Sequence, residues 1–279
     1  TAERLTAHLE YAIQQLKLPG APEALSFDTE MEQRFSRRVA LRDVVVRTLS
    51  GQAAGVAYQP IYALDADTPC MADVVSVAEE MDLIVALDWM MLEQVCAFFG
   101  AHRELDGCAV SVNFSARQFL APDAERRVLD TLERHGLAPT RLKLELTERV
   151  LAGDIRRVRA VMEALAARGV EFYLDDFGTG YSNLSSVVSL PLQYVKVDRS
   201  LLEAATNGGG GALLLRAVVE TFRAMGRGIL LEGVETPEQY ALACTLRADR
   251  LQGYYLARPM PGEELCALMR SGARRTRRT

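Results

Sequence analysis

The sequence has few of the residues that bind metals through nitrogen or sulfur. Its 279 residues include three histidines, which are scattered, and five cysteines, an odd number without any CxxC spacing. This pattern argues against a zinc site and a disulfide framework, and it favours a reducing, cytoplasmic compartment. No apolar run approaches the roughly 18 residues of a membrane-spanning helix, and the polar N-terminus has no signal-peptide pattern.

The sequence also lacks a GxGxxG motif after any predicted strand, which argues against an open dinucleotide-binding sheet. Its net charge of −5 gives no general reason to bind DNA. What remains is an ordinary globular composition, with 49% hydrophobic and 25% charged residues. The chain begins with Thr1 rather than Met, so we expect a fragment of a longer protein. Residues 271–279 form a basic tail that we expect to be frayed.

From residue 107 onward, apolar strand segments alternate with amphipathic helices. We expect strands at 107–114, 141–147, 170–174, 194–197, 228–231 and 251–255, each followed by a helix. An upstream strand at 55–64 contains Pro60, which requires an edge, a bulge or a strand end. A mostly helical stretch over 72–100 follows it. Repeated strand–helix pairs indicate parallel strands with helical crossovers, so we predict an α/β fold of the (β/α)₈ TIM-barrel type. A doubly wound open sheet is the competing architecture.

Polar side chains recur at the same end of these predicted strands. They are Asn113, Glu145, the pair Asp175 and Asp176, Lys196, Glu232, and Gln252, with Glu235 three residues after Glu232. In a parallel barrel the carboxyl ends of the strands converge on the face that holds active sites. Burying several carboxylates there without a cation costs several kcal/mol each, an order-of-magnitude figure. The cluster therefore predicts a metal site.

The predicted ligands are all oxygen atoms, which suits Mg²⁺, Mn²⁺ or Ca²⁺. Two such cations in one carboxylate cluster can activate a water and stabilise a leaving oxygen, so the pattern predicts hydrolysis of a phosphate ester. Asp175 is the best candidate for a bridging ligand, and Lys196 could orient the attacking water. The alternatives are an ordinary turn at Asp175 and Asp176 and a structural ion pair between Lys196 and Asp198.

These residues lie in motifs that resemble the EAL domain family, a cyclic di-GMP phosphodiesterase and receptor module. The matching motifs are YQPI at 58–61, AEEMDLI at 78–84, SVNFSARQF at 111–119, LELTE at 144–148, DDFGTGYSNL at 175–184, VKVDRSL at 195–201, EGVET at 232–236 and QGYYLARPM at 252–260. The preceding residues resemble a GGDEF–EAL tandem: 1–27 the end of a GGDEF-like domain, 28–54 a linker helix, and 55–270 the EAL barrel.

The resemblance implies a barrel whose first strand runs antiparallel to the others. It also implies hydrolysis of cyclic di-GMP to linear pGpG with Mg²⁺ or Mn²⁺, inhibition by Ca²⁺, and a homodimer with regulatory domains upstream. By motif, the metal ligands are Asn113, Glu145, Asp175, Asp176 and Glu232, and Lys196 positions the nucleophilic water. Glu232 and Glu235 are catalytic, with Glu235 acting as a support. Gln59 and Gln252 contact the substrate, and Glu148 anchors the loop 177–183.

One departure from the family stands out. The Glu-Ala-Leu motif and a following Leu-Arg should come about a dozen residues after YQPI, but residues 62–74 read YALDADTPCMADV. We therefore expect the motif glutamate, the arginine and the second barrel strand to be absent. Either the domain is degenerate and binds the nucleotide or a protein without hydrolysis, or the sequence omits a segment near residues 67–69. The retained acidic cluster favours an active phosphodiesterase, because a domain without catalysis would not need it.

Overall fold

The structure, a computed structural model, describes residues 56–66, 68–75, 84–147, 150, 154–178 and 187–271. All of these residues except 84–87, which form the first turn of a helix, belong to one compact unit that comprises Gly55–Val77 and Asp88–Thr279. The predicted GGDEF-like end and linker helix lie outside the described residues. So do the anchor Glu148, most of the loop 177–183, and the basic tail.

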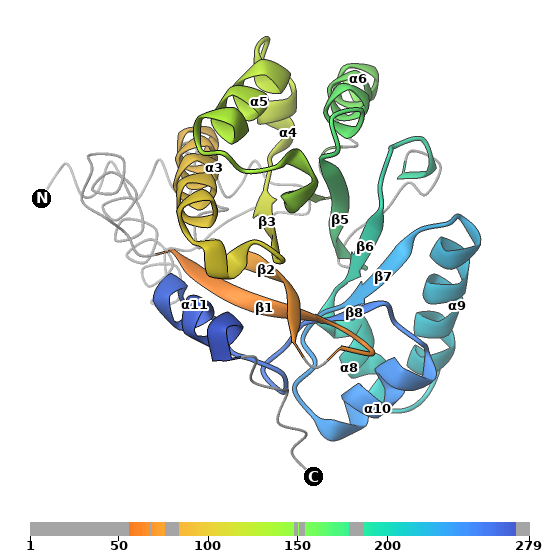
Figure 1. Cartoon of the computed structure of the whole chain (residues 1–279). Coiled ribbons are helices and arrows are strands. Elements are labelled where there is room, and N and C mark those ends of the chain that lie inside the picture. Colours follow the sequence, from red (N-terminus) through yellow and green to blue (C-terminus); the bar gives the residue numbers. More distant parts are fainter. Residues whose placement is uncertain are drawn as a thin grey trace, which may run out of the picture. The chain divides into compact units, whose positions relative to one another are not determined.

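Eight strands form a closed barrel (Figure 1). In chain order they are β1 (Ala57–Ala63), β2 (Pro69–Val75), β3 (Ala109–Asn113), β4 (Leu142–Thr147), β5 (Glu171–Phe177), β6 (Tyr194–Val197), β7 (Gly228–Leu231) and β8 (Arg250–Leu251). Strands β2 to β8 are parallel neighbours, and β1 closes the ring by antiparallel pairing with both β2 and β8. A short strand β9 (Met260–Pro261) adds to β1. The predicted barrel with an antiparallel first strand is confirmed.

The helices lie around the strands (Figure 1). They are α3 (Ile84–Ala101), α4 (Ala116–Phe119), α5 (Ala124–Arg134), α6 (Ile155–Ala166), α8 (Arg199–Thr206), α9 (Gly211–Ala224), α10 (Pro237–Thr245) and α11 (Gly262–Ser271), with 3-10 turns at Arg103–Leu105 and Pro139–Arg141. Within α6, Val158, Met162 and Leu165 recur at helical spacing and are all buried, so one face of this helix packs on the core. None of the helices in the described residues is both long and apolar enough to cross a membrane.

The second barrel strand corrects the sequence prediction. Strand β2 occupies Pro69–Val75, where we expected a missing strand followed by a helix that starts near residue 72. The residues between Ala63 and Pro69 form only a short hairpin connection, so β2 pairs with β1 directly, Gln59 opposite Asp73. Residues 76–83, between β2 and the first described residue of α3, lie outside the described residues.

Two features of the strands explain why the barrel accommodates this sequence. Pro60 lies where β1 pairs with neither β8 nor β9, since those contacts involve Tyr62–Ala63 and Ala57–Tyr58. Because proline has no N–H group, its position here costs no backbone hydrogen bond to β8 or β9. Inside the barrel, Ile61, Met71, Tyr173 and Leu230 form a buried apolar plug. Along β5, Glu171, Tyr173 and Asp175 share one face, so the plug residue Tyr173 lies between an acid toward each end of the strand.

Candidate active site

The centre of the candidate site is the ammonium group of Lys196, on β6. The side chain is 2% exposed, and its Nζ atom lies within 3.1 Å of a carboxylate oxygen from each of four acids: Glu145 (2.6 Å), Glu232 (2.9 Å), Asp73 (3.1 Å) and Asp175 (3.1 Å). These acids come from strands β4, β2 and β5 and from the residue after β7. The ion pair with Asp198, our alternative for Lys196, is not among its contacts; Asp198 instead caps α8 by accepting from the Ser200 N–H.

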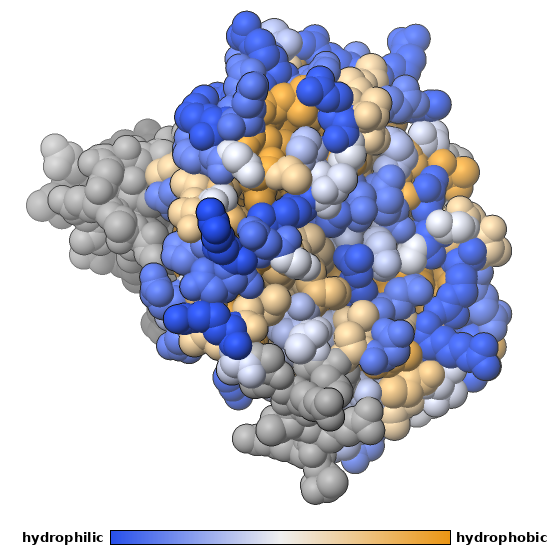
Figure 2. All heavy atoms as spheres, viewed as in Figure 1, coloured by the Kyte–Doolittle hydropathy of each residue, from blue (hydrophilic) through white to orange (hydrophobic). Residues whose placement is uncertain are grey.

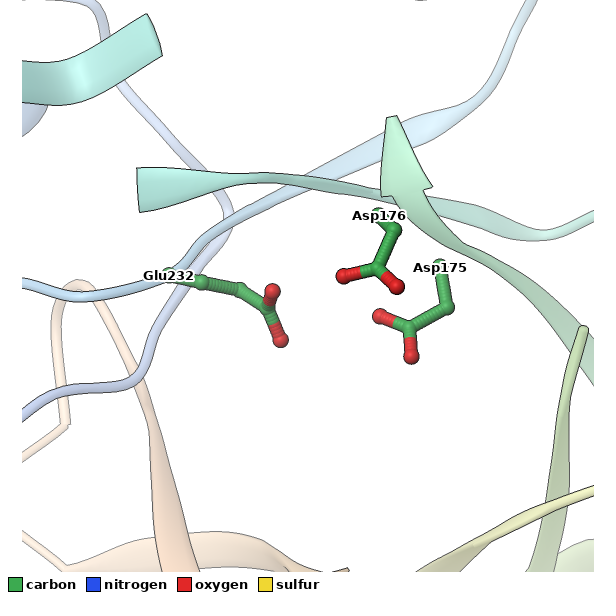
Figure 3. A group of neighbouring side chains, drawn as sticks. All are labelled: Asp175, Asp176 and Glu232. Atoms are coloured by element: carbon green, nitrogen blue, oxygen red, sulfur yellow. The ribbon is translucent and has the colours of Figure 1, made fainter. Parts of the chain in front are cut away.

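Asp175 and Asp176 point into the same site although they are sequence neighbours. On a regular strand, adjacent side chains point to opposite faces. Here the pairing of β5 with β6 shifts register between Leu174 and Phe177, and Asp176 has a φ of 55°. This bulge turns Asp176 toward Asp175 (Figure 3). One oxygen from each of Asp175, Asp176 and Glu232 lies within 4.8 Å of the others, a spacing that suits a shared cation.

Asp73 is a site residue that we did not predict. Its Oδ1 accepts from the Ser111 hydroxyl at 3.0 Å, and its Oδ2 accepts from Gln252 Nε2 at 3.1 Å. Strand β2 reads Ala72-Asp73-Val74, which places an acid where the family motif has glutamate. The signal was present in the sequence: a turn-forming Asp65–Pro69 segment precedes an apolar strand interrupted by one acid.

The two glutamines join this network. Gln252 Nε2 also donates to Gln59 Oε1 at 3.1 Å, and Gln59 Nε2 donates to the Ala257 carbonyl. Both side chains are buried. The structure thus brings Gln59 and Gln252 to the edge of the acidic cluster, where we expected substrate contacts; that role stays a prediction.

Asn113 and Glu235 also lie at the site, but they make fewer contacts there than the acids around Lys196. Asn113 ends β3 directly beside Glu145 in the parallel register. Glu235 is exposed in the segment after β7 and lines the same cavity as Glu232. Its backbone N–H donates to Gln239 Oε1, which fixes the segment at the start of α10. Their roles as metal ligand and catalytic support remain predictions.

Burial and like charges perturb the titration of this cluster. Burial raises the pKa of Glu232 to about 8, helped by Asp175 and opposed by Lys196. Burial and the charge of Asp73 raise the pKa of Glu145 well above its usual range. Burial would lower the pKa of Lys196, but the surrounding carboxylates raise it well above normal, so this ammonium stays charged. The single positive charge of Lys196 does not balance the five acidic side chains of the cluster.

The donor set fits a hard divalent cation. All five acids offer oxygen atoms, and within the described ranges no histidine or cysteine joins the group. Glu145 Oε1 is fully buried yet accepts no hydrogen bond from any residue that the structure describes, which leaves it available as a ligand. A buried carboxylate oxygen without a donor is costly unless a cation approaches it.

Comparisons with known proteins agree with this geometry. Residues 45–259 match the model of the EAL domain. The chain is 35% identical over 195 residues to the bifunctional diguanylate cyclase/cyclic di-GMP phosphodiesterase MucR of Pseudomonas aeruginosa, covering 68% of this chain and 28% of that protein. It spans roughly a third of the length of the first curated relatives that it matches.

Solved structures show the same fold. The EAL domain of Mycobacterium smegmatis DcpA is 30% identical with a TM-score of 0.71, covering 80% of this chain and 98% of that one. A PaMucR phosphodiesterase in complex with c-di-GMP is 29% identical, also with a TM-score of 0.71, covering 81% and 98%. With the sequence match over most of its length and the barrel that carries the acidic cluster, the chain belongs to the EAL domain family.

Proposed function

We propose that this domain hydrolyses cyclic di-GMP to linear pGpG with the help of Mg²⁺ or Mn²⁺. The observation that carries the proposal is the convergence of five carboxylates and one buried ammonium at the carboxyl ends of the barrel strands. The similarity to MucR, whose name includes cyclic di-GMP phosphodiesterase activity, supports the substrate.

The metal ligands would be Asp73, Glu145, Asp175, Asp176 and Glu232, with Asn113 beside Glu145. Two bound cations would supply an activated water and stabilise the leaving oxygen of the phosphodiester. The bulge at Asp175 and Asp176 suits this role, because it directs two neighbouring carboxylates into one site. Asp175, which also contacts Lys196, is our candidate for the bridging ligand.

Lys196 would orient the carboxylates and the attacking water. Its ammonium donates to Asp73 and Glu145 and lies 2.9 Å from Glu232, so it fixes side chains from several strands around one point. Because its pKa is raised, it stays an ammonium and donates hydrogen bonds to oxygen throughout the physiological range. Gln59 and Gln252 would contact the nucleotide, and Glu235 would support the segment that carries Glu232.

A cyclic di-GMP receptor without turnover is the second candidate. Strand β2 carries Asp73 where the family motif has glutamate, a carboxylate that is one methylene shorter. Only eight residues, 76–83, then connect β2 to α3. If the shorter side chain cannot reach a cation, the site would bind the nucleotide but hydrolyse it slowly. We also propose a homodimer in the cytoplasm with GGDEF-like regulatory domains upstream, as the resemblance implies.

Steady-state hydrolysis distinguishes the two candidates. Purified protein is incubated with cyclic di-GMP and Mg²⁺ or Mn²⁺, and the linear product is quantified. The phosphodiesterase proposal expects turnover of roughly 1 s⁻¹ or more, an ordinary enzymatic rate. Binding without product would support the receptor and overturn the enzyme.

Asp73 variants test the proposed ligand that the sequence motifs do not predict. We expect Asp73→Ala to lower kcat/KM by about 100-fold or more, because it removes a carboxylate from the site. Asp73→Glu should retain most of the activity, since it keeps the charge. The control is Asp65→Ala, an exposed acid in the β1–β2 turn. Unchanged kinetics for Asp73→Ala would remove Asp73 from the ligand set.

A further inference from the structure

A cavity of about 200 Å³ opens beside the acidic cluster. Its lining includes Gln59 from β1, Glu232 and Glu235 after β7, and Gln252 after β8, together with Arg199 at the start of α8. The cavity is thus continuous with the candidate metal ligands. A ligand that occupied it would touch both the acidic cluster and Arg199.

The charged side chains that line this cavity are mostly acidic, so they offer an anionic ligand little positive charge. Among the described residues that line it, three are acids, Asp198, Glu232 and Glu235, and one is a cation, Arg199. Asp198 is already engaged as the cap of α8. Within the described part of the chain, the Arg199 guanidinium forms no ion pair or hydrogen bond, so its five N–H groups remain available.

The sequence leaves few other sources of positive charge near β1 and β2. No lysine or arginine occurs between Arg47 and Arg103, a stretch that includes both strands and α3. Lys196 is buried and surrounded by acids, so its charge is already neutralised. Arg258 lies over the ring of the lining residue Tyr254, at 4.4 Å from its centroid, whereas Arg199 is itself part of the cavity lining. Helix α8 therefore supplies the cation at the cavity wall.

The backbone holds Arg199 close to Glu232. Gly233 has a φ of 65°, and a Cβ at this glycine would lie 2.3 Å from Arg199 Cβ. Only glycine permits the stem of Arg199 to pack this tightly on the segment after β7. Gln252, which also lines the cavity, is 5% exposed, and its Oε1 accepts no hydrogen bond from any described residue. An unpaired, buried acceptor at the cavity wall is typical of a site that receives a ligand donor.

We propose that Arg199 is the phosphate-binding residue of this domain and contacts a non-bridging oxygen of the substrate's phosphodiester. This inference rests on the proposed function and names how the same site recognises its substrate. A planar guanidinium can donate two parallel hydrogen bonds to a phosphate, which suits an arginine better than a lysine.

The test compares Arg199→Ala and Arg199→Lys with Arg216→Ala, a matched change of an exposed arginine on α9. Kinetics are measured with cyclic di-GMP and with bis(p-nitrophenyl) phosphate, a phosphodiester without nucleobases. For Arg199→Ala we expect KM to rise about 10-fold to 100-fold on both substrates, the effect of losing a charge-assisted hydrogen bond. Arg199→Lys should recover part of the affinity, and Arg216→Ala should behave as the wild type. Thermal midpoints should not change, because Arg199 is exposed.

The outcomes separate this inference from the proposed function. If the wild type hydrolyses cyclic di-GMP and Arg199→Ala has the same KM as the wild type, only the inference is overturned. A loss on cyclic di-GMP but not on the base-free substrate also overturns it, in favour of a nucleobase contact. If the wild type binds without turnover, the same comparison is made on Kd, and a weaker Kd for Arg199→Ala supports the inference while the hydrolase fails. A wild type that neither binds nor hydrolyses overturns both.

Discussion

The two ends of the barrel interior bury charge in different ways. At the amino-terminal end, Lys143 pairs with Glu171 at 2.9 Å, and Arg250 hydrogen-bonds to the Tyr173 hydroxyl and stacks over the Tyr194 ring at 4.2 Å. Each cation there has its own partner. At the carboxyl-terminal end, four acids contact the ammonium of Lys196, and a fifth, Asp176, lies beside Asp175 and Glu232. The apolar plug of Ile61, Met71, Tyr173 and Leu230 lies between them.

This difference separates a structural cluster from a functional one. The amino-terminal groups satisfy one another within the protein, so they can hold the barrel together without a ligand. The carboxyl-terminal acids are left with excess negative charge and with an unpaired oxygen on Glu145. Such an arrangement is unfavourable for stability alone and is typical of a site that receives cations.

The largest effect should follow from changing an acid at the carboxyl-terminal end. We expect Asp175→Asn to lower kcat by about 1,000-fold or more, because it removes the candidate bridging carboxylate and keeps the shape of the side chain. Hydrolysis of cyclic di-GMP in saturating Mg²⁺ measures this. The fold should persist, which circular dichroism can check. Activity within 10-fold of the wild type would contradict the central role of Asp175.

A smaller effect should appear in how stability depends on pH. Because the pKa of Glu232 is raised to about 8 from an ordinary value near 4.5, the folded protein binds more protons than the unfolded chain between these values. The stability of the metal-free protein should therefore fall as pH rises from about 4.5 to about 8. We expect Tm to drop by about 5 °C over this window, on the order of 1–2 kcal/mol.

Added Mg²⁺ and the variant Glu232→Gln provide two controls for this pH dependence of stability. Saturating Mg²⁺ should reverse the trend and add more stability at pH 8 than at pH 5, since cations bind the deprotonated carboxylates. Glu232→Gln should flatten the metal-free curve. If the Tm of the metal-free wild type rose with pH, it would contradict the raised pKa of Glu232 and the excess of negative charge at this site.

The smallest effect should come from the amino-terminal end. We expect Glu171→Gln to destabilise the protein by about 1 kcal/mol, because Lys143 loses its charged partner but keeps its hydrogen bond to the Thr140 carbonyl. Glu171 is about a third exposed, which limits the loss. Denaturant unfolding measures the difference, and kcat per folded molecule should stay at the wild-type value. A large fall in kcat would show that the two ends are coupled.

The sequence was sufficient for the parts of the fold that follow from periodicity. The expected segments 194–197 and 228–231 coincide with β6 and β7, because short apolar runs between helices leave little choice of boundary. Lys196 and Glu232 were predicted at the same barrel end for the same reason. Family motifs added the antiparallel direction of β1, which no local pattern encodes.

The errors came from features that depend on three-dimensional pairing. Residues of β2 were expected to start a helix because a short apolar run after a turn fits a helix as well as a strand, and only the pairing with β1 and β3 decides between them. Asp73 was missed with it. The expected strand at 251–255 is reduced to Arg250–Leu251, where pairing with β7 ends and the chain turns at Gly253. Gly253 must be glycine, since a Cβ there would lie 2.2 Å from the backbone of Val234.

The bulge at the end of β5 makes this site unusually sensitive to insertions and deletions. Two consecutive codons supply two carboxylates to one point only because the register shifts between Leu174 and Phe177 and Asp176 has a positive φ. Removing one residue from the bulge would restore regular alternation and turn one acid away from the site. In this stretch of the gene, residue count constrains variation as strongly as residue identity.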